Sequence, residues 1–197
     1  GGASAHATVS GTDAMPDRGH ALFDTALGCC GVAWGAQGLL ALQLPDADAA
    51  TVRAQLLRRA PGAVETTPSA LAQQAIDGVT ALLRGERVDL SELQLDLRGV
   101  PTLHARIYDI VRHIPCGRTL SYGDVAQQLG DRQLARAVGQ AMARNPFAPV
   151  VPCHRVLGAN GRPGGFSARG GLHTKLQLLL IEGAQLSNEP DLFANGT

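Results

Sequence analysis

The pattern of apolar residues changes from mostly alternating to helical near Gly99–Pro101, and this break divides the chain into two parts of different architecture. Before the break, several stretches alternate apolar and polar residues, as half-buried strands do. After it, apolar residues recur every three or four positions, as on one face of a helix. We therefore predict an α+β protein. Residues 21–100 form a small α/β domain with a short antiparallel sheet, and residues 101–186 form a mainly helical, winged-helix-like domain.

In the first domain, the pattern predicts a hairpin, two helices and a final strand. Apolar residues alternate within 23–44 around a turn at Gly35–Gly38, which is typical of a β-hairpin. Residues 46–60 and 69–84 carry apolar side chains at helical spacing. Alternation over Leu93–Leu97 predicts one more short strand.

The two ends of the chain are expected to lie outside these domains. Residues 1–20 are small and polar, so we expect them to be disordered, and residues 187–197 form a C-terminal tail. No apolar run is long enough for a membrane span, and the first ten residues lack the pattern of a secretion signal. We expect no contact with a membrane.

The four cysteines favour a reducing compartment, because they show no CxxC spacing and are too few to staple a secreted fold. We therefore expect a cytoplasmic protein of a bacterium. Adjacent Cys29 and Cys30 could join His20 at a metal, but no second pair of ligands completes such a site. We predict no metal.

The second domain has the spacing of a helix-turn-helix. Ser121 and Asp124 are placed as a capping box for a short helix, 122–129. A tight turn at Gly130–Asp131 leads into a second helix, 132–144. Any helical hairpin has similar spacing, so this motif alone leaves a structural role and a DNA-binding role open.

The second helix of this pair combines small residues with arginines. Ala135 and the alanines that follow it leave a slim surface, while Arg132 and Arg136 project charge. Close packing with a solvated arginine face is one interpretation, and insertion into a DNA groove is the other. The charge distribution favours neither strongly: residues 1–101 carry 7 basic and 11 acidic side chains, and residues 102–197 carry 10 and 6. The basic excess lies in the half with this helix.

A run of Pro152, Cys153, His154 and Arg155 in an apolar stretch is the strongest candidate for chemistry. A thiol becomes a strong nucleophile when a neighbouring base or positive charge raises its thiolate fraction, and an imidazole and a guanidinium follow directly. The alternative is a buried cysteine that only fills space. Prolines before the run and glycines after it favour a loop that shapes a pocket, so we interpret it as a reactive-cysteine site.

Four motifs of the second half occur in a fixed order. They are Ile114-Pro115-x-Gly117-x-Thr119-x-Ser121-Tyr122-Gly123, Ala135-Arg136-Ala137-Val138-Gly139, Asn145-Pro146 and Val151-Pro152-Cys153-His154-Arg155-Val156. In order and spacing they resemble the O6-alkylguanine-DNA alkyltransferases, also called methylated-DNA-protein-cysteine methyltransferases. The resemblance is strong over residues 102–186 and loose over 22–100. It implies single-turnover repair of double-stranded DNA: an O6-alkylguanine nucleotide is flipped out and its alkyl group is transferred irreversibly to a cysteine. O4-alkylthymine is a further candidate substrate.

The resemblance also implies roles for individual residues. Cys153 matches the alkyl acceptor, His154 the base that removes its proton through a water, and Glu182 the carboxylate that orients the imidazole. Tyr122 matches the hydrogen-bond donor to the purine. Asn145 matches a hinge that buttresses the acceptor.

A second set of residues is implied at the DNA and around the base. Arg136 matches the arginine that fills the space left by the flipped nucleotide. The other residues implied at the DNA are Ser121, Tyr122, Arg132, Ala135 and Arg155. The substrate pocket would be lined by Pro152, Val156, Phe166 and Ser167. Two extra residues near Ala168-Arg169 distinguish its wall from that of shorter-loop family members.

The resemblance implies a monomer that needs no cofactor. Two other functions remain open at this point. A non-catalytic sensor or regulator would bind alkylated DNA without transfer, but relatives of that kind lack the acceptor cysteine, and Cys153 is present. A cysteine hydrolase would ordinarily take its histidine from elsewhere in the chain, because adjacent side chains rarely face each other.

Overall fold

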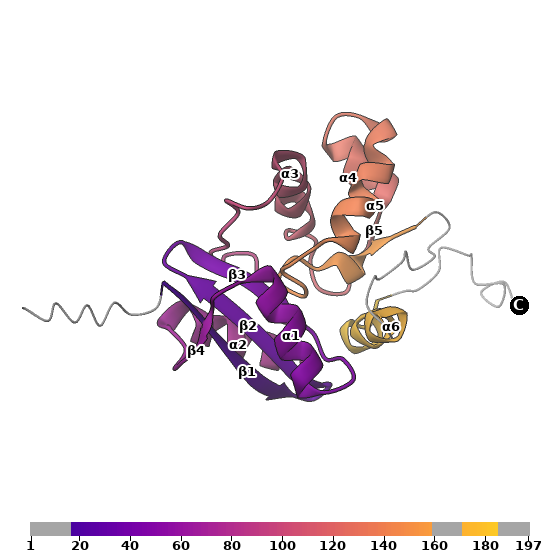
Figure 1. Ribbon diagram of the computed structural model, residues 1–197. Coiled ribbons are helices and arrows are strands. Elements are labelled where there is room, and N and C mark those ends of the chain that lie inside the picture. Colours follow the sequence, from indigo (N-terminus) through magenta and orange to yellow (C-terminus); the bar gives the residue numbers. More distant parts are fainter. Residues whose placement is uncertain (1–16, 159–170, 185–197) are drawn as a thin grey trace, which may run out of the picture.

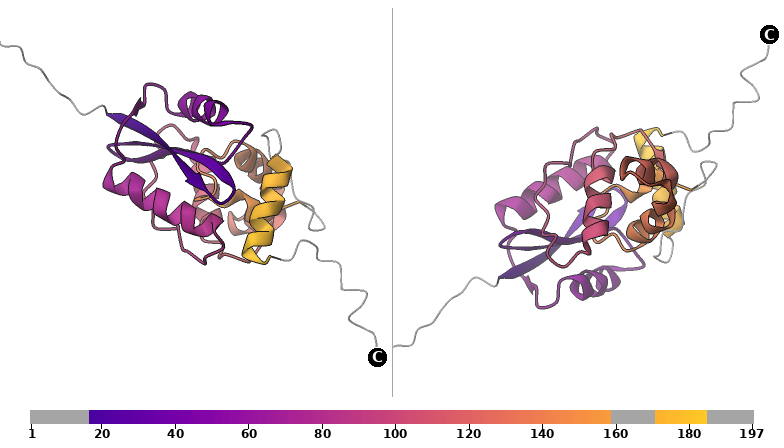
Figure 2. Two further views of the ribbon diagram at one scale, coloured as in Figure 1. Left: turned by 90° about the horizontal axis from the view of Figure 1, so that it is seen from below. Right: turned by 90° about the horizontal axis from the view of Figure 1, so that it is seen from above.

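A four-stranded sheet with one helix on each face forms the N-terminal half (Figures 1 and 2). The computed structural model describes residues 17–158 and 171–184. In their order across the sheet, the strands are β3 (Gly38–Gln43), β2 (Gly28–Gly35), β1 (Arg18–Thr25) and β4 (Val64–Glu65). Strands β1 and β4 run parallel, and the other neighbours run antiparallel. The two helices are α1 (Ala49–Arg59) and α2 (Ala70–Leu83).

Alternation along β2 explains why a helix covers each face. Val32 and Trp34 belong to the core cluster that contains Val79 of α2, whereas Ala33, between them, clusters with Leu56 of α1. Successive side chains of a strand point to opposite faces, so both faces of this strand are buried. The predicted hairpin and the two predicted helices are confirmed.

The fold begins earlier than the sequence predicted. Strand β1 starts at Arg18, inside the segment 1–20 that was expected to be disordered. His20 is buried, and its Nδ1 lies 3.0 Å from the carbonyl oxygen of Ala63. Pairing with β2 therefore organises these residues despite their polar composition, because the ladder supplies hydrogen bonds that the local pattern does not reveal.

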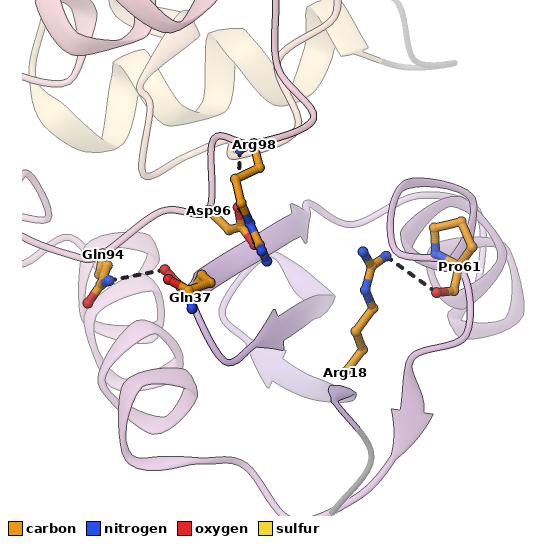
Figure 3. Close-up of polar contacts among 6 residues, drawn as sticks. All are labelled: Arg18, Gln37, Pro61, Gln94, Asp96 and Arg98. Carbon is orange, nitrogen blue, oxygen red and sulfur yellow. Dashed lines mark hydrogen bonds and ion pairs between the residues drawn. The ribbon is translucent and has the colours of Figure 1, made fainter.

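The strand predicted over Leu93–Leu97 is wrong, because this segment pairs with β3 at a single point. Leu39 donates to the carbonyl of Gln94 at 2.9 Å and accepts from the Asp96 amide at 2.8 Å. Figure 3 shows the Gln94 side chain bound to the Gln37 carbonyl and Arg98 folded onto Asp96. The Asp96 carboxylate also accepts from the Arg98 amide at 3.1 Å, a local turn that ends the pairing.

The C-terminal half is mainly helical. Its helices are α3 (Thr102–Val111), α4 (Tyr122–Gln128), α5 (Ala135–Ala143) and α6 (Gly171–Glu182), with 3-10 turns η1 (Arg132–Leu134) and η2 (Cys153–Arg155). Two short strands, β5 (Leu120–Ser121) and β6 (Val156–Leu157), pair in parallel. This pairing brings the start of α4 beside the segment that follows Cys153.

The predicted helix pair is present as α4 and α5. The Ser121 hydroxyl accepts from the Asp124 amide at 2.9 Å, and the Asp124 carboxylate accepts from the Ser121 amide at 3.1 Å, which confirms the capping box. Buried side chains of these helices belong to the same core cluster as Val32 and Trp34 of the sheet. Within the described ranges, none of the helices combines the length and apolar character of a membrane span.

Candidate active site

Cys153 opens a single 3-10 turn, η2, and its side chain is buried. The preceding turn is braced from within by Asn145. The side-chain amide of Asn145 donates to the Val151 carbonyl at 2.7 Å, and its oxygen accepts from the Phe147 amide at 2.9 Å. These two bonds fix the path of the backbone toward Cys153. This geometry supports the buttressing role that the sequence predicted for Asn145.

Behind the cysteine, three charged or titratable side chains form one buried cluster. His154 Nε2 lies 2.7 Å from Glu182 Oε1. Arg155 donates to the two oxygens of the same carboxylate, at 3.0 Å from Nε and 2.8 Å from Nη2, and also to the Ile114 carbonyl at 2.6 Å. Glu182, near the end of α6, therefore bridges two consecutive residues of η2.

The protonation states in this cluster follow from burial and pairing. Burial alone would raise the pKa of Glu182, but the hydrogen bonds from His154 and Arg155 outweigh it and lower that pKa to about 2. Burial lowers the pKa of His154, although the hydrogen bond to Glu182 and its negative charge act to raise it. A neutral imidazole beside an ionised carboxylate carries its proton on Nε2. The acceptor is then Nδ1, which is buried and has no hydrogen-bond partner among the described residues.

Burial sets the resting state of Cys153 as a thiol. It raises the pKa of Cys153, while a hydrogen bond with Asn145 and the positive charges of Lys175 and Arg59 act in the opposite direction. A buried thiol with nearby cations gains reactivity when a base takes its proton. His154 Nδ1 is the chemically suitable base in the same turn.

Lys175 and Arg59 are the two charged residues near this thiol that the sequence reasoning missed. Lys175 is buried on α6, and its ammonium donates to the Val156 carbonyl at 2.9 Å. Lys175 is the only lysine in a chain that otherwise uses arginine, and it lies in an apolar helix; that contrast was a usable signal. Arg59 had no such signal, because it is one of two arginines that end α1.

Tyr122 lies at the start of α4 and is half-buried against α5. A Cβ atom added to Gly139 would lie 3.5 Å from the Tyr122 ring, an ordinary van der Waals distance, so α5 lies directly against this ring. Burial, followed by the nearby Cys153, raises the pKa of Tyr122. The phenol is therefore neutral at physiological pH and able to donate a hydrogen bond.

The predicted DNA-contacting residues do not all lie at the surface. Arg136 and Arg132 are exposed at the beginning of α5 and in η1, and Arg132 lies 3.9 Å from the Asp124 carboxylate. Ala135 is half-buried, and the Ser121 hydroxyl caps α4. The prediction for Arg155 is wrong: it is buried, and its guanidinium is engaged by Glu182 and the Ile114 carbonyl.

The predicted pocket residues are only partly described. Pro152 and Val156 are buried beside Cys153, whereas Phe166 and Ser167 lie outside the described residues. A cavity of about 370 Å³ opens elsewhere, with Arg112, Cys116 and Arg155 in its wall, and Cys153 does not line it. No group of three or more histidine, cysteine or acidic side chains arranged for a metal occurs in residues 17–158 and 171–184.

Comparison with known proteins gives consistent results. Residues 102–184 match the family model described as 6-O-methylguanine DNA methyltransferase, DNA binding domain. A DNA base-flipping protein of Thermus thermophilus is 46% identical over 115 residues, which span 58% of this chain and 76% of that protein. A methylated-DNA-protein-cysteine methyltransferase of Mycobacterium leprae is 42% identical over 120 residues, or 61% of this chain and 70% of the relative.

Solved structures extend the similarity to most of the fold. The crystal structure of Mycobacterium tuberculosis OGT in complex with DNA matches with a TM-score of 0.67 and 32% identity. The match covers 83% of this chain and 92% of that one, so it includes residues on both sides of the break near Gly99.

Proposed function

This chain belongs to the methylated-DNA-protein-cysteine methyltransferase family, and on that premise we propose that Cys153 takes the alkyl group of O6-alkylguanine in DNA. The protein is a DNA-binding alkyltransferase of direct-reversal repair. The observation that carries the proposal is the buried thiol of Cys153 followed directly by a His154–Glu182 pair with a 2.7 Å contact.

The transfer is a displacement at the alkyl carbon. The proton of the Cys153 thiol passes through a water to His154 Nδ1, and the thiolate sulfur attacks the carbon attached to O6. The carbon–oxygen bond breaks as the carbon–sulfur bond forms, and guanine leaves and regains a proton. Tyr122 donates a hydrogen bond to the purine, which favours a neutral leaving base. The thioether is chemically inert, so each molecule acts once and requires no cofactor.

DNA is the partner of this protein, and the exposed start of α5 is the surface that we assign to it. An alkyl group on O6 lies inside the duplex, so the nucleotide must be extruded before a buried thiol can reach it. Arg136 is exposed and fills the space that the base leaves. Arg132, Ala135 and the Ser121 backbone complete the surface, and the protein acts as a monomer.

All four cysteines are free, which supports a reducing, cytoplasmic location. The duplex with O6-alkylguanine is the principal substrate of the proposal. O4-alkylthymine remains a further candidate substrate.

The test of the proposed function is the mass of the intact protein after incubation with duplex DNA that contains O6-methylguanine. We expect a gain of one methylene equivalent per chain, confined to the peptide that contains Cys153. The gain saturates at a stoichiometric amount of DNA because no step regenerates the thiol. An unmodified protein, or a methyl group on Cys29, Cys30 or Cys116, would contradict the proposal.

A second candidate function is suggested by the name of one relative, which is 46% identical and is called a DNA base-flipping protein. In that case this chain would recognise alkylated DNA and signal its presence without transfer. The same incubation separates the two, because a sensor would bind the duplex and leave its methyl group in place.

Arg136→Ala is expected to slow transfer from duplex DNA by about 10- to 100-fold, because an unfilled gap destabilises the extruded state by a few kcal/mol. Reaction with free O6-benzylguanine should keep its rate, since no base has to leave a stack. Arg58→Ala, which removes an equal charge from the exposed end of α1, serves as the control. The rates are measured by stopping the reaction at set times and determining the mass of the intact protein. Equal slowing with both substrates would argue against a role in flipping.

A further inference from the structure

The turn that leads to Cys153 is held from outside by the N-terminal half. Arg59 Nη1, in the last turn of α1, donates to the Asn145 carbonyl at 2.5 Å across 86 residues of sequence. The next carbonyl, that of Pro146, accepts from the Leu42 amide of β3 at 2.8 Å. We propose that Arg59 is a positioning residue for alkyl transfer: it fixes the Asn145 turn and supplies positive charge toward Cys153. This inference rests on the proposed function.

Arg59 completes the hydrogen bonding of Asn145. The side chain of Asn145 is already used within the turn, where it binds Val151 and Phe147. Its carbonyl has no role in that internal brace and is held by the guanidinium instead. The residue is thus fixed on both its side-chain and its backbone atoms. A charged donor strengthens such a bond and makes it directional.

Ordinary helix capping does not account for the contact that Arg59 makes. Basic residues near a helix C-terminus interact favourably with the helix dipole, and Arg58 and Arg59 both occupy that position in α1. The dipole does not require a contact with Asn145. Arg59 as a whole residue is exposed, like Arg58, but its Nη1 atom is held at the partly buried Asn145 carbonyl. Burial lowers the pKa of Arg59, whereas Tyr108 and Cys153 raise it, so its guanidinium lies within electrostatic reach of the thiol.

Charged and titratable groups from several elements act on Cys153. Two cations act on it from different elements, Lys175 from α6 and Arg59 from α1. The phenols of Tyr108 on α3 and Tyr122 on α4 also interact with it, and burial raises the pKa of both. His154 in the same turn is neutral, because burial lowers its pKa. Arg59 is therefore one of two cations that favour the thiolate, and burial lowers the pKa of the other, Lys175. Arg59 comes from the half without the motifs.

The test compares Arg59→Met and Arg59→Lys with Arg58→Met, a matched change at the neighbouring arginine, which is exposed as Arg59 is. Two quantities are followed against pH: the rate of Cys153 alkylation by iodoacetamide, read from the mass of its peptide, and the rate of transfer from free O6-benzylguanine. Thermal unfolding of each variant is recorded alongside. The iodoacetamide reaction reports the thiolate alone and does not depend on guanine chemistry.

We expect Arg59→Met to move the pH dependence of both reactions upward by about one pH unit and to slow transfer near neutral pH about tenfold. Arg59→Lys should keep the pH dependence but recover only part of the rate, because an ammonium lacks the fixed geometry of a guanidinium. Arg58→Met should match the parent.

An unchanged pH dependence in Arg59→Met overturns the inference, even if stability falls, because Arg59 would then be only a structural contact. If Arg59→Met does not fold, Arg59→Lys decides by itself: a parental rate overturns the positioning role, and a reduced rate with a parental pH dependence supports it. A parent that accepts no alkyl group would refute the proposed function, and the iodoacetamide profiles would still report on Arg59.

Discussion

Cys153→Ala is expected to bind O6-methylguanine duplex DNA with the affinity of the parent and to accept no methyl group. The thiol is buried and contributes nothing to the exposed surface of η1 and α5, so phosphate and groove contacts are preserved. Loss of one buried sulfur should lower the free energy of unfolding by only about 1 kcal/mol. The change thus separates recognition from chemistry. It converts the alkyltransferase into the sensor that we considered as the second function.

Binding is measured by fluorescence anisotropy with labelled duplex, and transfer by intact mass. Cys116→Ala is the matched control, because Cys116 is a free, half-buried cysteine that lies outside the proposed acceptor site. The control should bind and react like the parent. A methyl group that still appears on Cys153→Ala would refute the acceptor assignment.

Glu182→Gln is expected to lower the free energy of unfolding by about 3–5 kcal/mol, because it leaves the buried guanidinium of Arg155 without its carboxylate. It should also slow transfer at least about 100-fold, since the neutral amide no longer holds the His154 imidazole as a base. The first effect is measured by urea unfolding and the second by the rate of reaction with O6-benzylguanine.

The exposed pair of Arg84 and Glu86 provides the comparison, and Glu86→Gln should cost about 1 kcal/mol or less. Acid pH gives a further readout. Because the pKa of Glu182 is lowered from 4.5 to about 2, its stabilisation is complete above pH 4.5 and is lost as the pH falls toward 2. Glu182→Gln should lack this part of the pH dependence. Equal losses in the two variants would show that the buried cluster adds nothing.

Local patterns predicted the elements whose determinants lie close in sequence. The capping box at Ser121 and Asp124 needs only a separation of three residues, and the hairpin around Gly35–Gly38 needs only alternation. The predicted strand at Leu93–Leu97 failed because pairing depends on a partner edge, and β3 offers that segment only one residue.

In the site, too, contacts between residues close in the sequence were predicted, and most contacts between distant residues were not. The proximity of His154 to Cys153 is visible in the sequence, and the family resemblance correctly paired His154 with Glu182. The sequence did not reveal that the Arg155 side chain points into the protein. Its direction is set by a carboxylate partner, Glu182, which comes from α6 and is distant in the sequence. Arg59 was also out of reach, since its contact joins residues 86 positions apart.

The hydrogen bond from Leu42 to Pro146 bears on how much of the chain forms a functional module. Residues 102–184 are the portion that the family model matches, yet the acceptor turn inside it is anchored to β3 and α1, which lie outside that portion. The core also runs without a break from the sheet into the helices. The portion that the family model matches is therefore smaller than the portion that packs around one continuous core. The N-terminal half thus takes part in the site by supporting, from α1 and β3, the turn that carries Cys153.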